Sequence, residues 1–376
     1  MALGVILLQL FVVHTTSAQC AFSNLNAQYC VDQPAFSLTG GTNYFGPGVS
    51  GSTFNPASAG VGTHTLITTD GNASGYFVST SGTFAPLSGS GTALALGNDD
   101  EVTGVPIGFT FNFFGLNYSQ VRVGDNGIVG FSSSVATSSN LLLPDPTAPN
   151  NIIAASWDDM IPDGSSTIEY FTTGSAPFRK FIVNYTNLKF SGNADRITVQ
   201  VQLHETTNIV ELHSTGITAG VDEKTQGIQN GSGSIAYFAP GRNFTNFTAT
   251  NDFVQFRPQC LDIRTVTINA LPQDKTVTPV LPTTVCSGQT VTLTVVSSQS
   301  GINYEILDQS GTVVSGIVVG TGGDLNITSS ALSTSVTSLR IRATNASTTC
   351  SRLLDGADAV VVNAIPSFTS TLTPAA

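Results

Sequence analysis

The sequence has 376 residues, a net charge of −11 at pH 7 and 13 Lys plus Arg residues. Hydrophobic residues make up 40% of it, enough to bury more than one core. So few cationic residues cannot neutralise a phosphate backbone or hold the chain on an anionic membrane. The composition therefore excludes nucleic-acid binding and favours an all-β protein whose surface is solvated by hydroxyl and amide groups.

The first residues predict export. Leu3 to Val13 is an apolar run of signal-peptide length, and Thr16-Ser17-Ala18 then supplies small residues for cleavage, although no Lys or Arg precedes the run. The run is too short to span a bilayer comfortably, and no second long apolar run occurs later in the sequence. We expect a signal peptide at residues 1–18 and an extracellular product, secreted or attached to the outer surface, without membrane insertion.

Residues 19–69 contain short β-compatible runs separated by Gly-Gly, Gly-Pro-Gly and Asn-Pro, which predict tight turns. The stretch is too short for a complete sandwich, so we expect it to pack on later residues of the chain. Its sequence resembles PKD-like or Ig-like repeats of large exported Bacteroidetes proteins at three places: Phe45 to Gly51, Thr53 to Ala57 and Ala59 to Leu66.

Residues 70–259 carry the clearest strand pattern. Ile107, Phe109, Phe111 and Phe113 alternate with small or polar residues, the period of a strand with one face on a core. Asn126-Gly127 then predicts a hairpin with a type I′ turn. Further alternation occurs at Ile153-Ala155-Trp157, Phe181-Val183-Tyr185 and Val199-Val201-Leu203. These patterns predict a β-sandwich.

Several motifs in this region resemble NIDO-like domains of extracellular matrix and bacterial surface proteins. They are Pro106 to Gly115, Asn126-Gly127, Ile152 to Asp159, Thr206 to His213 and Gly227 to Asn230. The resemblance implies a sandwich over about 70–258 and an extracellular interaction role, and it implies no catalytic mechanism.

Residues 260–366 predict a further Ig-like sandwich. An alternating strand of Val291, Leu293 and Val295 comes after Cys286, and a second strand precedes Cys350. The segment resembles Ig-like modules of the same Bacteroidetes proteins over Val285 to Val295 and Arg342 to Cys350. Residues 367–376 are expected to be a linker or the start of another repeat, so the chain is expected to continue into further repeats. The predicted fold class is thus all-β, with tandem β-sandwich modules.

The five cysteines fit an exported protein that uses disulfides sparingly. Cys286 and Cys350 flank paired strands, which predicts a bridge between them, and Cys20 with Cys30 is the next most economical pair. Cys260 is then left over, so either its partner lies outside the chain or the first three cysteines pair differently.

Two polar groups are candidates for chemistry. Asp158, Asp159 and Asp163 share one loop and could supply oxygens to a calcium ion, although the spacing is not that of an EF-hand. Alternatively, they solvate the loop and cap its backbone. A hairpin that pairs Leu203 with Val210 would place His204 beside Glu211. It would also place His213 roughly 13 Å further along the strand, too far for one metal to join both histidines.

No enzyme is indicated. The sequence has no GxSxG elbow, HExxH motif, P-loop or GxGxxG. We predict a non-catalytic modular protein that acts as an adhesin or structural spacer and contacts an extracellular protein or glycan. The alternative is a carbohydrate-binding accessory part of a secreted polysaccharide-degrading enzyme, but the aromatic residues are mostly Phe that alternates inward, which favours core over sugar platform.

Overall fold

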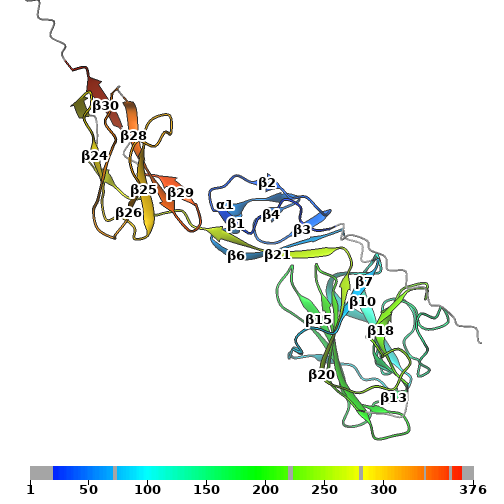
Figure 1. Ribbon diagram of the computed structural model, residues 1–376. Coiled ribbons are helices and arrows are strands. Elements are labelled where there is room, and N and C mark those ends of the chain that lie inside the picture. The colour runs from blue at the N-terminus through cyan, green and yellow to red at the C-terminus, as the bar shows by residue number, and fades with distance from the viewer. Residues whose placement is uncertain are drawn as a thin grey trace, which may run out of the picture.

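The computed structural model describes residues 20–70, 74–218, 223–278, 283–333, 336–354 and 358–365. Within these ranges the chain is built of β-strands with one short helix, arranged as tandem sandwiches, which confirms the predicted fold class. Figure 1 shows the modules arranged one after another in a row. The expected signal peptide (1–18) and the expected further repeat (367–376) lie outside the described residues. None of the helices in the described ranges has the length and apolar character needed to span a membrane.

The first module combines two distant stretches of the chain. Its elements are β1 (Gln28–Cys30), β2 (Phe36–Ser37), β3 (Asn43–Phe45), β4 (Val49–Ser50), β5 (Thr53–Phe54), α1 (Pro56–Ala59), β6 (Gly62–Thr69) and β21 (Leu261–Asn269). The main sheet has the order β1-β21-β6-β3, and β2, β5 and β4 form a small second sheet. Strand β21 therefore completes a sheet whose preceding strand, β6, ends some 190 residues earlier, as Figure 1 shows.

Strand β21 changes the expected division of the chain. The sequence pattern assigns residues 260–366 to the C-terminal domain, whereas the structure pairs Leu261 with Thr69 and continues antiparallel to Ile268 opposite Gly62. The reason is burial, because Val266 packs in the core of the first module. The 19–69 stretch does pack on later residues, as expected, but on a strand that comes after the next domain.

The central sandwich, residues 76–258, is inserted between β6 and β21. Its strands are β7 (Tyr76–Ser79), β8 (Thr92–Ala93), β9 (Glu101–Phe113), β10 (Leu116–Gly124), β11 (Ile128–Gly130), β12 (Ile152–Trp157), β13 (Met160–Ile161), β14 (Thr167–Thr173), β15 (Lys180–Phe190), β16 (Arg196–His204), β17 (Val210–Ile217), β18 (Thr225–Gln229), β19 (Ala236–Phe238) and β20 (Ala249–Pro258). A six-stranded sheet, β19-β18-β12-β11-β10-β9, faces an eight-stranded sheet that includes β7-β20-β17-β16-β15-β14-β8. The main core lies between them.

The predicted alternation on β9 is confirmed. Ile107, Phe109, Phe111 and Phe113 are all buried in the core between the sheets. The predicted hairpin is also confirmed, because β10 pairs with β11 antiparallel. Its turn is not type I′, however. Gly127 has a positive φ of 72° and Asn126 does not. The Asn126 side chain donates to Asp99 and accepts from the Met160 N–H.

Trp157 is buried on the opposite face from the one that simple alternation predicts. Ile153 and Ala155 lie in the core between the sheets, but Trp157 belongs to a second cluster under the loop after β11. The register of β12 against β18 shifts between Ala154 and Trp157, and this irregularity breaks the period of two.

The C-terminal sandwich has two facing sheets, β22-β24-β27 and β23-β30-β28-β25-β26. Its strands are β22 (Val277–Thr278), β23 (Thr283–Cys286), β24 (Thr292–Val295), β25 (Ile302–Leu307), β26 (Val318–Val319), β27 (Leu325–Thr328), β28 (Val336–Asn345), β29 (Ser351–Leu353) and β30 (Asp358–Asn363). Their inward side chains form a separate core that includes Leu293 and Val295 from the predicted alternating strand.

The predicted Cys286–Cys350 bridge is wrong. Cys286 lies opposite Asn363 on β30, beyond the point where Val360 pairs with the first residue of β28. Cys350 comes after the other end of β28. The two cysteines therefore lie at opposite ends of a ten-residue strand, roughly 30 Å apart at 3.3 Å per residue. Cys286 is a free, exposed thiol.

The predicted Cys20–Cys30 bridge is wrong for a similar reason. Cys20 bonds to Cys260 at the start of β21, with their Cα atoms 5.2 Å apart. Cys30 lies opposite Asn269 at the far end of the same strand. It bonds to Cys350 instead, with a Cα separation of 5.5 Å. Cys20–Cys260 thus ties the start of the first module to the point where the chain returns from the central sandwich, and Cys30–Cys350 joins the first module to the C-terminal sandwich.

Candidate functional site

A cleft of about 590 Å³ lies between the first module and the central sandwich. Strands β3 and β6 form one wall, and β9, the segment before β15 and the turn between β16 and β17 form the other. Its lining residues are Asn43, Phe45, Thr69, Phe109, Thr110, Asn112, Asn117, Pro177, Arg179, Glu205, Thr206 and Asn208. A cleft at a domain junction is a common place for a ligand site. We call it the junction cleft.

Arg179 and Glu205 form an ion pair in the junction cleft. The Arg179 Nη2 and Nε atoms lie 2.5 and 2.8 Å from the two Glu205 carboxylate oxygens, and the Arg179 backbone N–H also donates to Glu205. The guanidinium lies over the ring of Phe109 and donates to the Gly108 carbonyl. Hydrogen bonds from Arg179 hold the pKa of Glu205 below its usual range. Both charges are satisfied within the protein, so the pair fixes the turn.

The amide side chains of the junction cleft also hold the backbone in place. Asn208 accepts from the Asn112 N–H at 2.9 Å, and Asn112 donates to Asn117 at 2.9 Å. Asn208 has a φ of 51°, which Asn tolerates better than most residues. The cleft therefore offers amides, hydroxyls and aromatic edges to a polar ligand.

An apolar contact fixes the junction beside this cleft. Ile209, at the turn between β16 and β17, packs against Ile67 and Leu261 of the first module, and Phe45 lies against this cluster. Ile209, Ile67 and Leu261 are each at most 6% exposed. The hydrophobic contact anchors the tip of a central hairpin to the main sheet of the first module.

The structure does not assemble the predicted calcium ligands. The carboxylate of Asp163 pairs with Arg196, at 2.5 Å, and accepts from Ser165 at 2.7 Å. These hydrogen bonds hold the pKa of Asp163 well below its usual range. Asp158 is buried and accepts from the backbone N–H of Asp159, which is the capping role that the alternative predicts. In the described ranges, no group of metal-ligating side chains close enough to share an ion includes these three aspartates.

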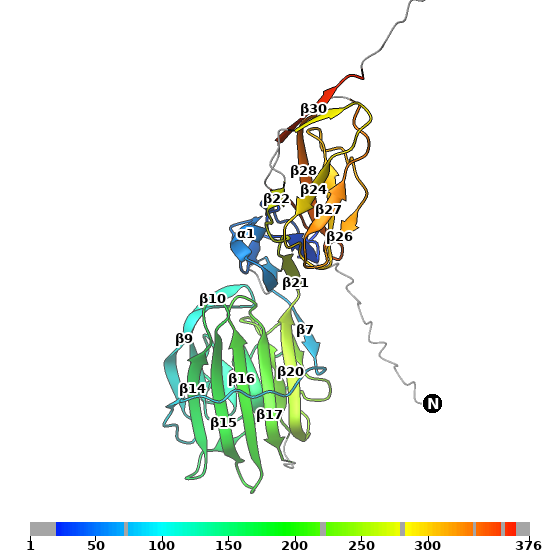
Figure 2. The ribbon, with the colours of Figure 1, turned by 90° about the vertical axis from the view of Figure 1, so that its left-hand side faces the viewer.

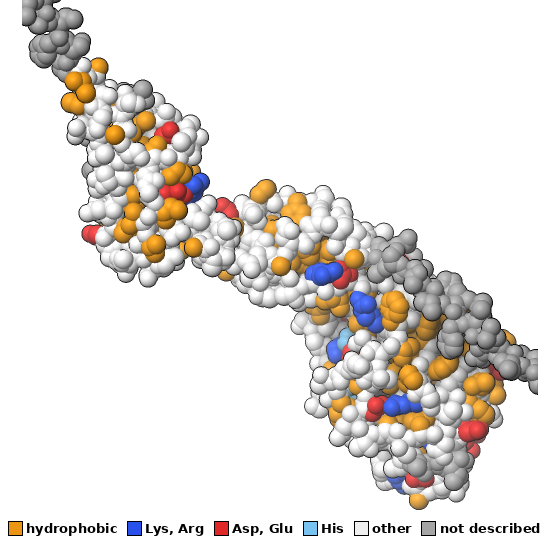
Figure 3. All heavy atoms as spheres, in the orientation of Figure 1, with side chains coloured by type: hydrophobic (Ala, Val, Ile, Leu, Met, Phe, Trp, Pro, Cys, Tyr) orange, Lys and Arg blue, Asp and Glu red, His pale blue; other side chains and the backbone are white. Residues whose placement is uncertain are grey.

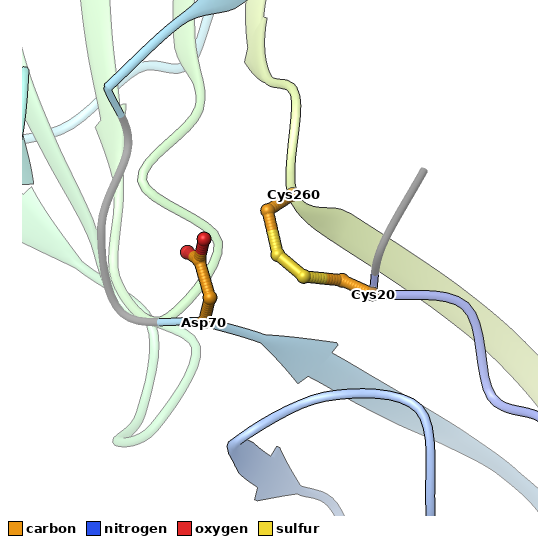
Figure 4. Close-up of side chains that lie close together, drawn as sticks. All are labelled: Cys20, Asp70 and Cys260. Atoms are coloured by element: carbon orange, nitrogen blue, oxygen red, sulfur yellow. A yellow bond between two sulfur atoms is a disulfide. The ribbon is translucent and has the colours of Figure 1, made fainter. Parts of the chain in front are cut away.

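One group of such side chains does lie close together: Cys20, Asp70 and Cys260. Figure 4 shows the Asp70 carboxylate beside the bond between the two sulfurs. Because both thiols are consumed in the disulfide, neither can act as a thiolate ligand. The group therefore marks a covalent junction and not a metal centre.

The predicted contact between His204 and Glu211 is confirmed at 2.9 Å, and Leu203 does pair with Val210. Sequence reasoning missed His213, whose Nε2 also reaches the Glu211 carboxylate, at 3.3 Å. The backbone distance between the two histidines does not predict this contact, because both side chains reach the carboxylate of Glu211. Burial lowers the pKa of His204. Burial alone would raise the pKa of Glu211, but hydrogen bonds from His204 and His213 outweigh it and hold that pKa well below its usual range.

His213 and two glutamines are buried by a strap, residues 80–91, which crosses the outer face of the eight-stranded sheet (Figure 2). Ala85 donates its N–H to His213 Nδ1 at 3.2 Å, which leaves the Nε2 proton of the neutral ring to point at Glu211. Gln200 bonds both the N–H and the C=O of Leu87. The alternation of side chains along the strands places Gln200 and His213 on the outer face of the sheet. Their low solvent exposure follows from the strap that covers them, which no local sequence pattern indicates.

Comparisons with known proteins bear on the central sandwich. A family model described as NIDO related matches residues 75–277, more than half of the chain, which confirms the NIDO-like prediction for this domain. No curated protein matches the chain. Among solved structures, the chain is similar to the adhesin domain of Epf from Streptococcus pyogenes. The identity is 10%, the match covers 73% of this chain and 100% of that one, and the TM-score is 0.18. A TM-score this low supports no conclusion about shared architecture.

Proposed function

Because the chain belongs to the NIDO-related family, we propose that it is a non-catalytic, modular extracellular protein that acts as an adhesin or structural spacer at the cell surface. The charge distribution supports an extracellular role over nucleic-acid binding. Figure 3 shows acidic and basic side chains that are few and scattered on the face in view. Such a surface interacts through hydroxyls, amides and apolar groups, which suits contact with extracellular proteins or glycans.

The observation that carries the proposal is that a disulfide lies at each junction of the first module. Cys20–Cys260 lies beside the junction cleft, and Cys30–Cys350 joins the first module to the C-terminal sandwich. Disulfides persist in oxidising surroundings, which agrees with export. Fixed junctions between consecutive sandwiches hold a distal module at a set distance and orientation, as a spacer requires.

The finer parts of the proposal come from the sequence. We propose that residues 1–18 direct export and that the first and C-terminal modules are PKD-like or Ig-like units of the Bacteroidetes type. We also propose that the chain continues into further repeats. An adhesive domain at the end of a repeat array would then be presented away from the cell surface, where partners are accessible.

A binding assay tests the proposal. Beads carrying the full exported chain are placed on surfaces coated with extracellular glycoproteins or polysaccharides, and retention under flow is compared with beads carrying an unrelated sandwich protein. The ligand is then recovered from the surface, and its molecular mass is measured by mass spectrometry. We expect retention on at least one surface with ligand of unchanged mass. Equal retention of both kinds of bead on every surface would refute adhesion, and progressive conversion of the ligand would refute the non-catalytic assignment.

A further inference from the structure

A second groove lies at the same end of the central sandwich as the junction cleft, and the β9–β10 hairpin contributes residues to both. We propose that this second groove binds a neutral saccharide, with Tyr118 and Asn151 hydrogen-bonding adjacent sugar hydroxyls and the ring of Phe114 contacting an apolar face of the sugar. This inference rests on the proposed function in assuming an extracellular ligand, and it adds the ligand's chemical class and the residues that recognise it.

Loops of the six-stranded sheet form this groove, which has a volume of about 620 Å³. They are the turn between β9 and β10, the residues entering β12, and the turn between β18 and β19. The lining residues are Ser74, Phe114, Leu116, Tyr118, Ser132, Asn151, Asn230, Gly231, Ser232 and Ile235. The volume falls in the range of about 300–1,000 Å³ that is usual for small-ligand sites. We call it the sugar groove.

The sugar groove contains an acceptor that the protein leaves unpaired. Asn151 is 2% exposed, and its Oδ1 atom has no hydrogen-bond partner. Its Nδ2 atom donates to the hydroxyl oxygen of Tyr118 and, at 3.4 Å, to Ser132. Leaving a buried amide oxygen without a partner is destabilising, so a ligand that donates a hydrogen bond to it relieves that penalty on binding.

Tyr118 complements this acceptor with a donor. Its hydroxyl oxygen accepts from Asn151, so its own proton remains available to a ligand. A tyrosine hydroxyl keeps its proton at neutral pH, and burial raises the pKa of Tyr118 further. One donor and one acceptor side by side match two neighbouring hydroxyl groups, each of which can both donate and accept. This pairing is characteristic of sugars and is rare in apolar ligands.

The backbone and the neighbouring rings hold these groups in position before any ligand arrives. Asn151 has a φ of 59°, and its backbone bonds to Asn230 and Phe131 on the flanking strands. Tyr118 packs on Phe131 with ring centres 4.8 Å apart, and Phe114 packs on Tyr76 at 5.0 Å. A fixed aromatic surface avoids the entropy cost of ordering side chains on binding.

The lining of the sugar groove is uncharged, and this favours neutral ligands over charged ones. None of its lining residues is acidic or basic, in contrast to the junction cleft with Arg179 and Glu205. An anionic ligand such as a sulfated or uronic saccharide would find no counter-charge there. Exposed apolar side chains at the rim, Leu116 at 56% and Ile235 at 42%, suit the C–H faces of a neutral sugar.

The test uses the full chain on an array of neutral gluco-, manno-, galacto- and xylo-configured oligosaccharides, with uronic oligosaccharides as the charged comparison. Bound oligosaccharides are then titrated by calorimetry. Tyr118→Phe keeps the ring and removes the hydroxyl, so we expect its affinity to fall about tenfold. Tyr170→Phe makes the same chemical change on β14, outside the sugar groove, and should leave affinity unchanged. Leu116→Asp alters an exposed rim position, where folding is not at stake, and should also weaken binding.

Three outcomes would overturn the saccharide assignment. They are no retention of any neutral oligosaccharide, preferential retention of uronic ones, and affinity that Tyr118→Phe and Leu116→Asp leave unchanged. The adhesion assay separates this failure from that of the proposed function. Beads that still attach to a protein-coated surface, while the array is negative, would refute the sugar groove alone. Absence of both activities would refute the two together.

Discussion

At the residue scale, Asp125 shows how a buried carboxylate couples the fold to pH. Its side chain is fully buried, and its two oxygens accept from the backbone N–H groups of Asp99 and Asp100, each at 3.0 Å. Burial nevertheless raises its pKa to about 6. Because this exceeds the value of 3.8 for an unperturbed Asp, the group stabilises the fold fully below about pH 4, and that contribution is lost as pH rises through 6.

Comparison of the wild type with Asp125→Asn should isolate this contribution. We expect the free energy of unfolding of the wild type, relative to the variant, to fall by on the order of 3 kcal/mol between pH 4 and pH 8. The backbone N–H that the Asn side chain leaves unpaired adds an offset that does not depend on pH. Urea denaturation at several pH values measures the difference, with the exposed Asp32→Asn as control. Parallel wild-type and Asp125→Asn curves would contradict the expectation.

Cys286 gives a direct check of the disulfide pattern. Its thiol is exposed and free, whereas Cys260 is bonded to Cys20. Treatment of the native oxidised chain with iodoacetamide should therefore modify Cys286 and leave Cys260 untouched, as peptide mass mapping would show. Labelling of Cys260 instead of Cys286 would contradict this disulfide pattern and would support the bridge between Cys286 and Cys350 that strand spacing predicts.

At the scale of elements, the strap of residues 80–91 depends on a few polar side chains of the sheet. Gln200 bonds Leu87 through both amide atoms, at 2.8 and 2.7 Å. Gly82 permits the close approach, because a Cβ there would overlap the ring of Phe253. The strap covers polar side chains of the sheet, among them Gln200, Gln202 and His213, that would otherwise be open to water.

Gln200→Ala should loosen the strap without unfolding the sandwich. The loss of both hydrogen bonds to Leu87 is expected to cost roughly 1–3 kcal/mol. Faster hydrogen exchange at the Leu87 amide, with little change at the amides of β9, would show a local effect. Gln120→Ala, an exposed change on β10, is the matched control. Unchanged exchange at Leu87 would show that the strap is held by other contacts.

Sequence reasoning succeeds for elements whose pattern is local. Alternation from Ile107 to Phe113 predicts β9, and the apolar pairing of Leu203 with Val210 predicts the register of the β16–β17 hairpin. It fails where a local irregularity in a strand determines which face a side chain takes, or where a strand pairs with a partner far away in the sequence. The irregular register in β12 moves Trp157 to the other face, and nothing near residue 261 indicates that the strand starting there pairs with β6.

The inserted arrangement makes a strong prediction about independent folding. Thr69 lies opposite Leu261, and Tyr76 lies opposite Pro258, so the chain enters and leaves the central sandwich at adjacent points. Replacement of residues 71–259 by a short turn should leave a first module that folds and keeps both disulfides. Thermal unfolding and disulfide mapping test this.

A chain that ends at residue 259 is the matched control for that experiment. It lacks β21 and with it Val266 and Ile268 of the first core. Residues 20–70 should then be cut rapidly by protease, while the central sandwich resists. Equal resistance of the two parts would contradict the role assigned to β21.

At the scale of the whole molecule, cysteine pairing is the property that spacing along the chain predicts least well. Spacing favours bridges inside a module, between Cys286 and Cys350 or between Cys20 and Cys30. The structure joins residues 240 and 320 positions apart, each time across the start or end of β21. The insertion accounts for the Cys20–Cys260 bridge, since the chain returns from it beside the start of the first module. Cys30–Cys350 arises at the far end of β21, where the C-terminal sandwich follows. The insertion also explains the junction cleft, whose walls come from the first module and from the inserted central sandwich.

The bridge between Cys30 and Cys350 should control the shape of the molecule in solution. It is the covalent tie between the first module and the C-terminal sandwich besides the connecting chain itself. On the chain-entropy model, closure of a loop of 320 residues stabilises the fold by about 6 kcal/mol because it restricts the unfolded chain. In the folded protein the bridge limits how the C-terminal sandwich can move. In the double variant Cys30→Ser/Cys350→Ser, small-angle X-ray scattering should show a broader distribution of overall dimensions than in the wild type. Cys286→Ser removes the free thiol and serves as control. Identical scattering from the double variant and the wild type would mean that non-covalent contacts alone fix the orientation of the C-terminal sandwich.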